Sequence, residues 1–224
     1  RISQNDLVNN QKRVNDLFMS VALVQELERD VIDLQRHLLI YKETASESSV
    51  TNFYELMKNV DEKLKILGES KRQKEGFYID ENLLERMAGH LKDYNDNFSG
   101  VVEGRSQRNA IFKDEIQDKL FQFRELIKIL EVNEVQQERG YALNVKYHEA
   151  MAEKNINQYL ISPDYEYVTE FNRQYAFIRD LMNDKFNNNQ QALLLLSGLK
   201  KDFVRLTQVT RGYVFLVNVV MAGS

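Results

Sequence analysis

The side chains best suited to chemistry in this chain are arginines and hydroxyl residues near its two ends. A guanidinium binds a carboxylate through two parallel hydrogen bonds, and it keeps its charge when water is removed. If the helices that carry these residues run antiparallel and side by side, the residues would form a binding site for a small dicarboxylate. The set is Asn10, Arg13, Arg205, Thr207, Thr210 and Arg211.

Each of these residues also has an ordinary structural role open to it. Arg13 is three residues before Asp16, and Arg205 is three residues after Asp202, spacings at which helical neighbours form ion pairs. The Thr210 hydroxyl can bond to a carbonyl of its own helix. The sequence therefore leaves both a ligand site and a set of local contacts open.

A second group of basic residues lies further along the first helical segment. Arg29 and Arg36 are seven residues apart, with Asp33 between them and His37 next to Arg36. This spacing puts the two arginines on one helix face, where Arg29, Arg36 and His37 would form a second anion site. The alternative is an intrahelical network that runs from Arg29 through Asp33 to Arg36.

Two polar residues interrupt the apolar stripe of the same segment. Glu28 and Gln35 occupy positions where the pattern expects an apolar side chain. Polar residues at such positions often determine register or oligomeric state at some loss of stability. Lining a pocket and facing a second subunit are the other roles that the pattern leaves open.

Signals for metal binding and catalysis are missing from the sequence. His37, His90 and His148 are far apart, and none has a second ligand at the usual spacing, so no metal site is expected. The chain has no cysteine, which excludes disulfides and thiolate chemistry. Because it also lacks a glycine-rich phosphate loop, a nucleophile elbow and an HExxH motif, we expect neither an enzyme nor a cofactor.

The elements that must position these residues are helices. Apolar residues recur in alternating steps of three and four, and the 224 residues include only one proline. We expect an all-α fold of six helices, two long and four short, with no strands. Their expected ranges are about 3–44, 50–68, 81–98, 107–160, 163–186 and 190 to the end.

Local signals mark the ends of these helices. A serine-rich turn at 46–49, a polar segment at 69–78 and a glycine-containing stretch at 99–106 are expected to separate the first four. Ser162-Pro163-Asp164 is a typical helix start, and the asparagines at 187–189 end that helix. The net charge of −4 argues against nucleic acid as a partner.

The helix lengths predict two stacked four-helix bundles that share the two long helices, since short turns favour antiparallel neighbours. The whole chain, 1–224, would be a single domain. One bundle, which the resemblance described below implies to be membrane-distal, would be about 20–130, and the other, membrane-proximal by the same resemblance, would be about 1–20 plus 131–224. Both ends of the chain would then lie at the same end of the domain.

Two segments of the chain resemble a known family. Residues 26–44 (ELERDVIDLQRHLLIYKET) and 213–223 (YVFLVNVVMAG) are similar to the helical bimodular sensor domain of bacterial methyl-accepting chemotaxis proteins. A related domain occurs in hybrid histidine kinases. The resemblance implies a periplasmic domain of an inner-membrane protein, flanked by transmembrane helices outside this fragment. It also implies a homodimer.

In that family each bundle can bind a small molecule. The resemblance therefore implies a ligand-binding domain that recognises a small organic acid or a periplasmic binding protein and passes a helix displacement across the membrane. The membrane-proximal site would use the first set of residues, and the membrane-distal site would use Arg29, Arg36 and His37. Two alternatives remain: the sensor domain of a hybrid histidine kinase, and a coiled-coil scaffold without a ligand.

Overall fold

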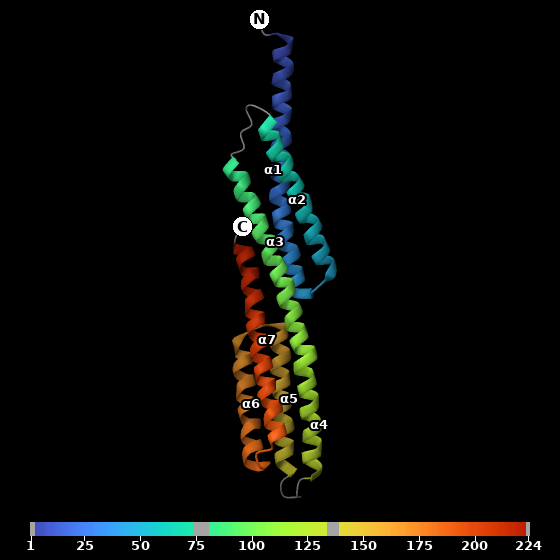
Figure 1. Cartoon of the computed structure of the whole chain (residues 1–224), viewed down its shortest axis with the longest axis vertical. Coiled ribbons are helices and arrows are strands. Elements are labelled where there is room, and N and C mark those ends of the chain that lie inside the picture. Colours follow the sequence, from blue (N-terminus) through green and yellow to red (C-terminus); the bar gives the residue numbers. More distant parts are fainter. Residues whose placement is uncertain (1–2, 74–80, 134–138, 223–224) are drawn as a thin grey trace. The chain divides into compact units, whose positions relative to one another are not determined.

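The computed structural model describes residues 3–73, 81–133 and 139–222. All regular secondary structure in these residues is helical. Because α3, η1 and α4 follow one another without a break, these residues form six continuous helices, and the expected all-α class is confirmed. The elements are α1 (Gln4–Thr44), α2 (Glu47–Gln73), α3 (Glu81–Ala110), the π-helix η1 (Ile111–Ile116), α4 (Gln117–Asn133), α5 (Arg139–Ile161), α6 (Tyr165–Lys185) and α7 (Gln190–Ala222) (Figure 1).

Side-chain caps and left-handed residues explain several helix ends. The Ser3 hydroxyl accepts a hydrogen bond from the Asp6 backbone N–H and begins α1. Ala45, with φ of 53°, ends α1 and donates its N–H to the Tyr41 carbonyl. Asn187 and Asn188 also have positive φ, and they end α6 as expected.

The predicted start of α6 is displaced by two residues. Asp164, and not Ser162, occupies the cap position, and the helix begins at Tyr165. The Ser162 hydroxyl donates a hydrogen bond to the Asp164 carboxylate instead of binding a backbone N–H of the helix. Pro163 therefore precedes the cap, in the extended segment, rather than occupying the first helical position.

The turn predicted for 99–106 is wrong, because this stretch is helical throughout. Its glycines serve close packing instead of a turn. A Cβ on Gly104 would lie 2.8 Å from the Cβ of Tyr213, and a Cβ on Gly100 would lie 2.6 Å from Cδ1 of Leu216. Glycine at these two positions lets α7 approach the backbone of α3.

The unbroken helix predicted for 107–160 is also wrong. α4 ends at Asn133 and α5 begins at Arg139, and the two helices run antiparallel (Figure 1). The Arg124 guanidinium lies 2.9 Å from the Glu153 carboxylate, and Lys146 pairs with Glu131. The long continuous helix of this region therefore runs from 81 to 133.

The π-helix η1 corrects a mismatch in the apolar pattern. Most buried positions along this helix recur in steps of three and four, as at 91, 94, 98 and 101 and at 116, 120, 123 and 126, but Ile111 and Ile116 are five residues apart. In an α-helix the residue four after Ile111, which is Glu115, would face the core. The wider π turn puts Ile116 in the core and leaves the Glu115 carboxylate partly exposed.

The chain divides into two compact units. Unit 1 contains 1–103 and 214–224, and unit 2 contains 104–213. The membrane-distal and membrane-proximal bundles were expected at other boundaries, about 20–130 against 1–20 plus 131–224. The dividing points lie within α3 and within α7, so each of these helices contributes to both units.

Unit 1 is built from α1, α2, the first part of α3 and the end of α7. The rings of Phe53 and Phe98 stack with centroids 3.8 Å apart. The Lys63 ammonium on α2 lies 2.7 Å from Asp30 and 3.2 Å from Glu26, both on α1. The hydrogen bond to Asp30 is the main reason that the pKa of Lys63 is raised.

Gln35 connects three helices within unit 1. Its side-chain amide lies 3.4 Å from the Tyr94 hydroxyl on α3 and 3.4 Å from the Val220 carbonyl on α7. This polar interruption of the α1 stripe therefore contacts the chain's own helices, as a register-setting residue would. Glu28, the other interruption, is exposed.

Unit 2 is built around side chains from η1, α4, α5, α6 and the first part of α7. Figure 1 shows α4, α5, α6 and α7 running alongside one another. Phe203 lies at the centre of one apolar cluster, 4.5 Å from Phe171 and 5.7 Å from Tyr159 between ring centroids. Tyr159, a member of this cluster, also carries a buried hydroxyl group.

Candidate functional site

The most unusual polar group of unit 2 is a buried arginine. Arg108, in the last turn of α3, is only 8% exposed. Its guanidinium donates hydrogen bonds to the Leu160 carbonyl at the end of α5 and to the Tyr213 hydroxyl on α7, at 3.2 and 2.8 Å. It also bonds to the side-chain oxygen of Asn109. Among the described residues, all the partners of this cation are neutral.

Hydroxyl groups surround the same region. Tyr159 on α5 is 2% exposed, and its hydroxyl donates to the Thr207 carbonyl. Burial raises the pKa of the Tyr159 hydroxyl, and the positive charges of Arg211 and Arg108 act in the opposite direction. Arg211 itself is exposed. We call Arg108, Tyr159, Thr207, Thr210, Arg211 and Tyr213 the arginine–tyrosine cluster.

Helical spacing explains why α7 brings three predicted residues to this cluster. Thr210 and Arg211 lie three and four residues after Thr207, so each is its neighbour on the helix surface, with Thr210 turned to the core and Arg211 to solvent. Both threonines are buried, and both hydroxyls donate to carbonyls of their own helix, to Val204 at 2.7 Å and to Leu206 at 2.7 Å. The backbone bonding considered for Thr210 in the sequence is thus confirmed.

The arginine–tyrosine cluster has the chemistry of an anion site. A buried guanidinium without a carboxylate partner has lost hydration that its neutral partners replace only in part. An anionic ligand would supply the missing charge, and the Tyr213 hydroxyl, which accepts from Arg108, would supply a further donor. The second guanidinium, on exposed Arg211, would attract the ligand from solvent.

The structure does not bring the other predicted residues to this cluster. Asn10 and Arg13 belong to unit 1, on a part of α1 where almost every residue is exposed. The end of α7 meets α1 at Gln35, which is 22 residues (35 − 13) beyond Arg13. At about 1.5 Å per residue this separation is roughly 33 Å along α1, so Arg13 lies far from the part of α1 that the end of α7 contacts.

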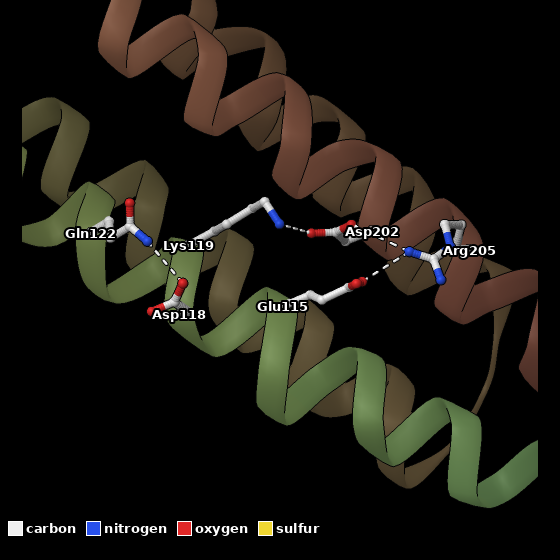
Figure 2. Close-up of polar contacts among 6 residues, drawn as sticks. All are labelled: Glu115, Asp118, Lys119, Gln122, Asp202 and Arg205. Atoms are coloured by element: carbon white, nitrogen blue, oxygen red, sulfur yellow. Dashed lines mark hydrogen bonds and ion pairs between the residues drawn. The ribbon is translucent and has the colours of Figure 1, made fainter.

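Arg205 is occupied by carboxylates on the outside of unit 2. Its guanidinium lies 2.9 Å from Glu115 and 3.9 Å from Asp202, so the pairing with Asp202 considered above is present but is the longer contact. The Lys119 ammonium lies 2.5 Å from the other oxygen of Asp202. Figure 2 shows these contacts, which run from Lys119 to Asp202, Arg205 and Glu115 and connect α7 to the continuous helix formed by η1 and α4.

The residues predicted for the membrane-distal site lie in unit 1 but form no common cluster. Arg29 and Arg36 are exposed, and Arg36 pairs with Asp33 at 3.4 Å, as in the intrahelical alternative. His37 is half-buried, and its Nδ1 atom has no hydrogen-bond partner among the described residues. An anion site on this face has no further support from the contacts.

Sequence reasoning missed Arg108, although a signal was present. The apolar stripe of α3 reaches Phe98 and Val101, and continuing it in steps of four and three leads to Arg105 and Arg108. The expected turn at 99–106 hid this continuation. Arginines at two successive core-facing positions would have indicated a buried cationic site.

A second buried polar group lies at the α4–α5 contact. Glu149 is 6% exposed, and one of its oxygens lies 3.5 Å from the Arg124 guanidinium, which also binds Glu153. Burial, and then the negative charge of Glu153, raises the pKa of Glu149 to about 7, whereas Arg124 acts to lower it. We therefore expect Glu149 to affect the pH dependence of stability, and we do not assign it to a ligand site.

Neither a cluster of metal ligands nor a membrane-spanning stretch occurs in the described residues. Within 3–73, 81–133 and 139–222, no three histidine, aspartate or glutamate side chains gather as metal ligands would. In the same residues, no helix has an apolar stretch long enough to cross a membrane. Comparison with known proteins finds no family model, no curated protein and no solved structure that matches this chain.

Proposed function

We propose that this chain is the periplasmic ligand-sensing domain of a transmembrane chemotaxis receptor and that it binds a small organic anion at the arginine–tyrosine cluster. The observation that supports the proposal is the buried Arg108 guanidinium, whose described partners are all neutral. A carboxylate would pair with this cation and with Arg211. The site proposed from the sequence is thereby moved from Arg13 and Arg205 to Arg108.

The proposal includes the finer architecture, two stacked four-helix bundles. If transmembrane helices flank the domain, as the family resemblance implies, unit 1 would be the membrane-proximal unit, since residues 1–103 and 214–224 belong to it. The anion site would belong to unit 2. α3 and α7 both contribute to the site and to unit 1, so a shift of either helix on binding would reach unit 1 through a continuous backbone.

Thermal unfolding in the presence of small carboxylates tests the proposal. Acetate, succinate, malate and citrate would be compared at neutral pH, with sodium chloride at matched ionic strength as the control. An anion present at 100 times its Kd stabilises the folded state by about 2.7 kcal/mol, which corresponds to a rise in Tm of roughly 5–10 °C. We expect at least one carboxylate to give such a rise.

Two arginine variants locate the site. Arg108→Lys keeps the positive charge but loses the two-pronged geometry, and Arg211→Gln changes an exposed residue that the fold does not need. Both should reduce the Tm rise by more than half, whereas Arg179→Gln, which alters an exposed arginine on α6 beside Asp180, should not. An unchanged response in the first two variants, or no response in the original protein, would contradict the proposal and favour the ligand-free scaffold.

The exposed start of α1 supports the homodimer that belongs to the same proposal. Leu7, Val14, Leu17 and Val21 are each about half exposed, and their spacing forms a coiled-coil stripe with Asn10 between the first two. A second copy of α1 would cover this stripe in a symmetric dimer.

Leu17→Asp should therefore shift the protein from dimer to monomer. The free energy of unfolding of each chain should change little, because Leu17 is 45% exposed in the single chain. Sedimentation velocity over a range of concentrations would measure the change. Asn15→Asp, which adds the same charge outside the stripe, should leave the dimer intact. A monomeric original protein, or a dimeric Leu17→Asp variant, would disprove pairing through α1.

A further inference from the structure

A groove lies on the surface of unit 2 beside the π-helix, and the anion site does not use it. It has a volume of about 240 Å³ and lies between η1 and α7. Gln107, Ala110, Ile111, Asp114, Glu115, Arg205 and Val209 line it. Its volume is smaller than that of pockets for drug-sized ligands, so the ligand would be of amino-acid size.

The π turn creates the charged wall of this groove. It directs Ile116 to the core and leaves Asp114 and Glu115 as neighbours on the groove side. π-helical turns are rare and are often found at functional sites. The structure therefore has a local backbone irregularity and a groove at the same place.

The two walls carry opposite charges. Asp114 is exposed, and one oxygen of Glu115 accepts from an Nη atom of Arg205 on the other wall (Figure 2). Asp202, which pairs with Arg205, and Lys119, which pairs with Asp202, add one negative and one positive charge next to the groove. Three carboxylates and two cations give the site a net charge of −1, which disfavours a simple carboxylate and favours a ligand with an ammonium group.

The remaining edge of the Arg205 guanidinium has donors for a carboxylate. Both ion pairs of Arg205, with Glu115 and with Asp202, use Nη1, so among the described residues Nη2 and Nε remain as donors for a ligand. Ile111, Ala110 and Val209 form an apolar surface between the two charged walls. A ligand that fits has an ammonium and a carboxylate on one carbon and an aliphatic side chain.

We propose that this groove binds a small aliphatic α-amino acid. Its ammonium group lies against Asp114 and Glu115, its carboxylate lies on Arg205, and its side chain covers Ile111 and Val209. The groove is a second site, independent of the anion site at Arg108. Because it is open to solvent, affinity is weak, with a Kd on the order of 0.1–1 mM.

The test is an NMR titration of the whole chain with L-leucine, observed on the methyl groups of Ile111 and Val209. The comparison ligands are 4-methylpentanoate, which lacks the ammonium group, and 3-methylbutylamine, which lacks the carboxylate. We expect L-leucine to shift both methyl signals and to bind at least five times more tightly than either comparison ligand. Asp114→Asn and Arg205→Gln should each weaken binding at least fivefold.

Asp118→Asn is the matched control, because Asp118 bonds to Gln122 outside the groove and its loss should leave binding unchanged (Figure 2). Arg211→Gln should also leave L-leucine binding unchanged, which separates this site from the anion site. No methyl shift up to 20 mM L-leucine (about 20 times the upper limit of the Kd expected above), equal binding of 4-methylpentanoate, or unchanged binding in both groove variants would overturn the proposal.

Discussion

Glu149→Gln should stabilise the protein at pH 8 and have almost no effect at pH 4. Glu149 is buried at the α4–α5 contact, and its pKa is raised from 4.5 to about 7 in the folded state. The folded state therefore holds this proton more tightly than the unfolded state does. Its contribution to stability is complete below pH 4.5 and is lost as the pH rises through 7.

The expected size follows from the pKa difference. A shift of one unit corresponds to about 1.4 kcal/mol, so a shift of about 2.5 units means that the charged carboxylate would cost about 3 kcal/mol at pH 8. Glutamine has the shape of the neutral acid and avoids this cost, while Arg124 keeps its contact with Glu153. Urea denaturation of both proteins at pH 4, 6 and 8 would measure the difference.

Glu125→Gln is the control for this prediction. Glu125 lies on α4 and pairs with Lys128 on the surface, where an ion pair contributes less than about 1 kcal/mol at any pH. Its variant should show no growth of stability between pH 4 and pH 8. A Glu149→Gln variant that is equally destabilised at all three pH values would show that the ion pair with Arg124 outweighs burial.

Gly104→Ala should destabilise the protein, although alanine is the better helix former. The new Cβ would lie 2.8 Å from the Cβ of Tyr213, an atom attached to the α7 backbone. α3 and α7 would have to move apart at the place where Tyr213 binds Arg108. Overpacking of this kind costs about 1–3 kcal/mol.

Gly89→Ala is the matched control in the same helix. A Cβ there meets no atom within 4 Å, so the variant should gain about 0.5–1 kcal/mol from helix propensity alone. Thermal unfolding should therefore move the two alanine variants in opposite directions, by roughly 2–4 °C per kcal/mol. Equal gains in Tm for both would mean that the α3–α7 approach at Gly104 is not close.

The helices could be predicted from the sequence because helix formation depends mainly on residues that are close together in the chain. Apolar steps of three and four and the presence of only one proline predicted helices throughout. The asparagines at 187–189 also predicted a real end, since asparagine tolerates the left-handed backbone found at Asn187 and Asn188. These signals depend only on residues within one or two turns.

The site could be predicted only in part. Thr207, Thr210 and Arg211 were singled out by residue type, and they do lie close together on α7 in unit 2. Their partners were misassigned, since Arg13 belongs to unit 1 and Arg108 was hidden by a turn that does not exist. The register between two helices depends on packing across the interface, which the spacing within either helix does not specify.

By itself, the sequence determined that the chain is helical, where α1 and α6 end, and that cationic and hydroxyl groups lie close together on α7. Tertiary structure decided what the glycines at 100 and 104 do, because a helical glycine differs from a turn glycine only when another helix packs against it. It also decided that the five-residue step from Ile111 to Ile116 forms a π turn. Burial of the Ile116 side chain in the core compensates for the less favourable hydrogen bonding of that turn. The pairing of Arg108 with Tyr213 follows from the first of these two features, because that contact requires a continuous α3 lying close against α7.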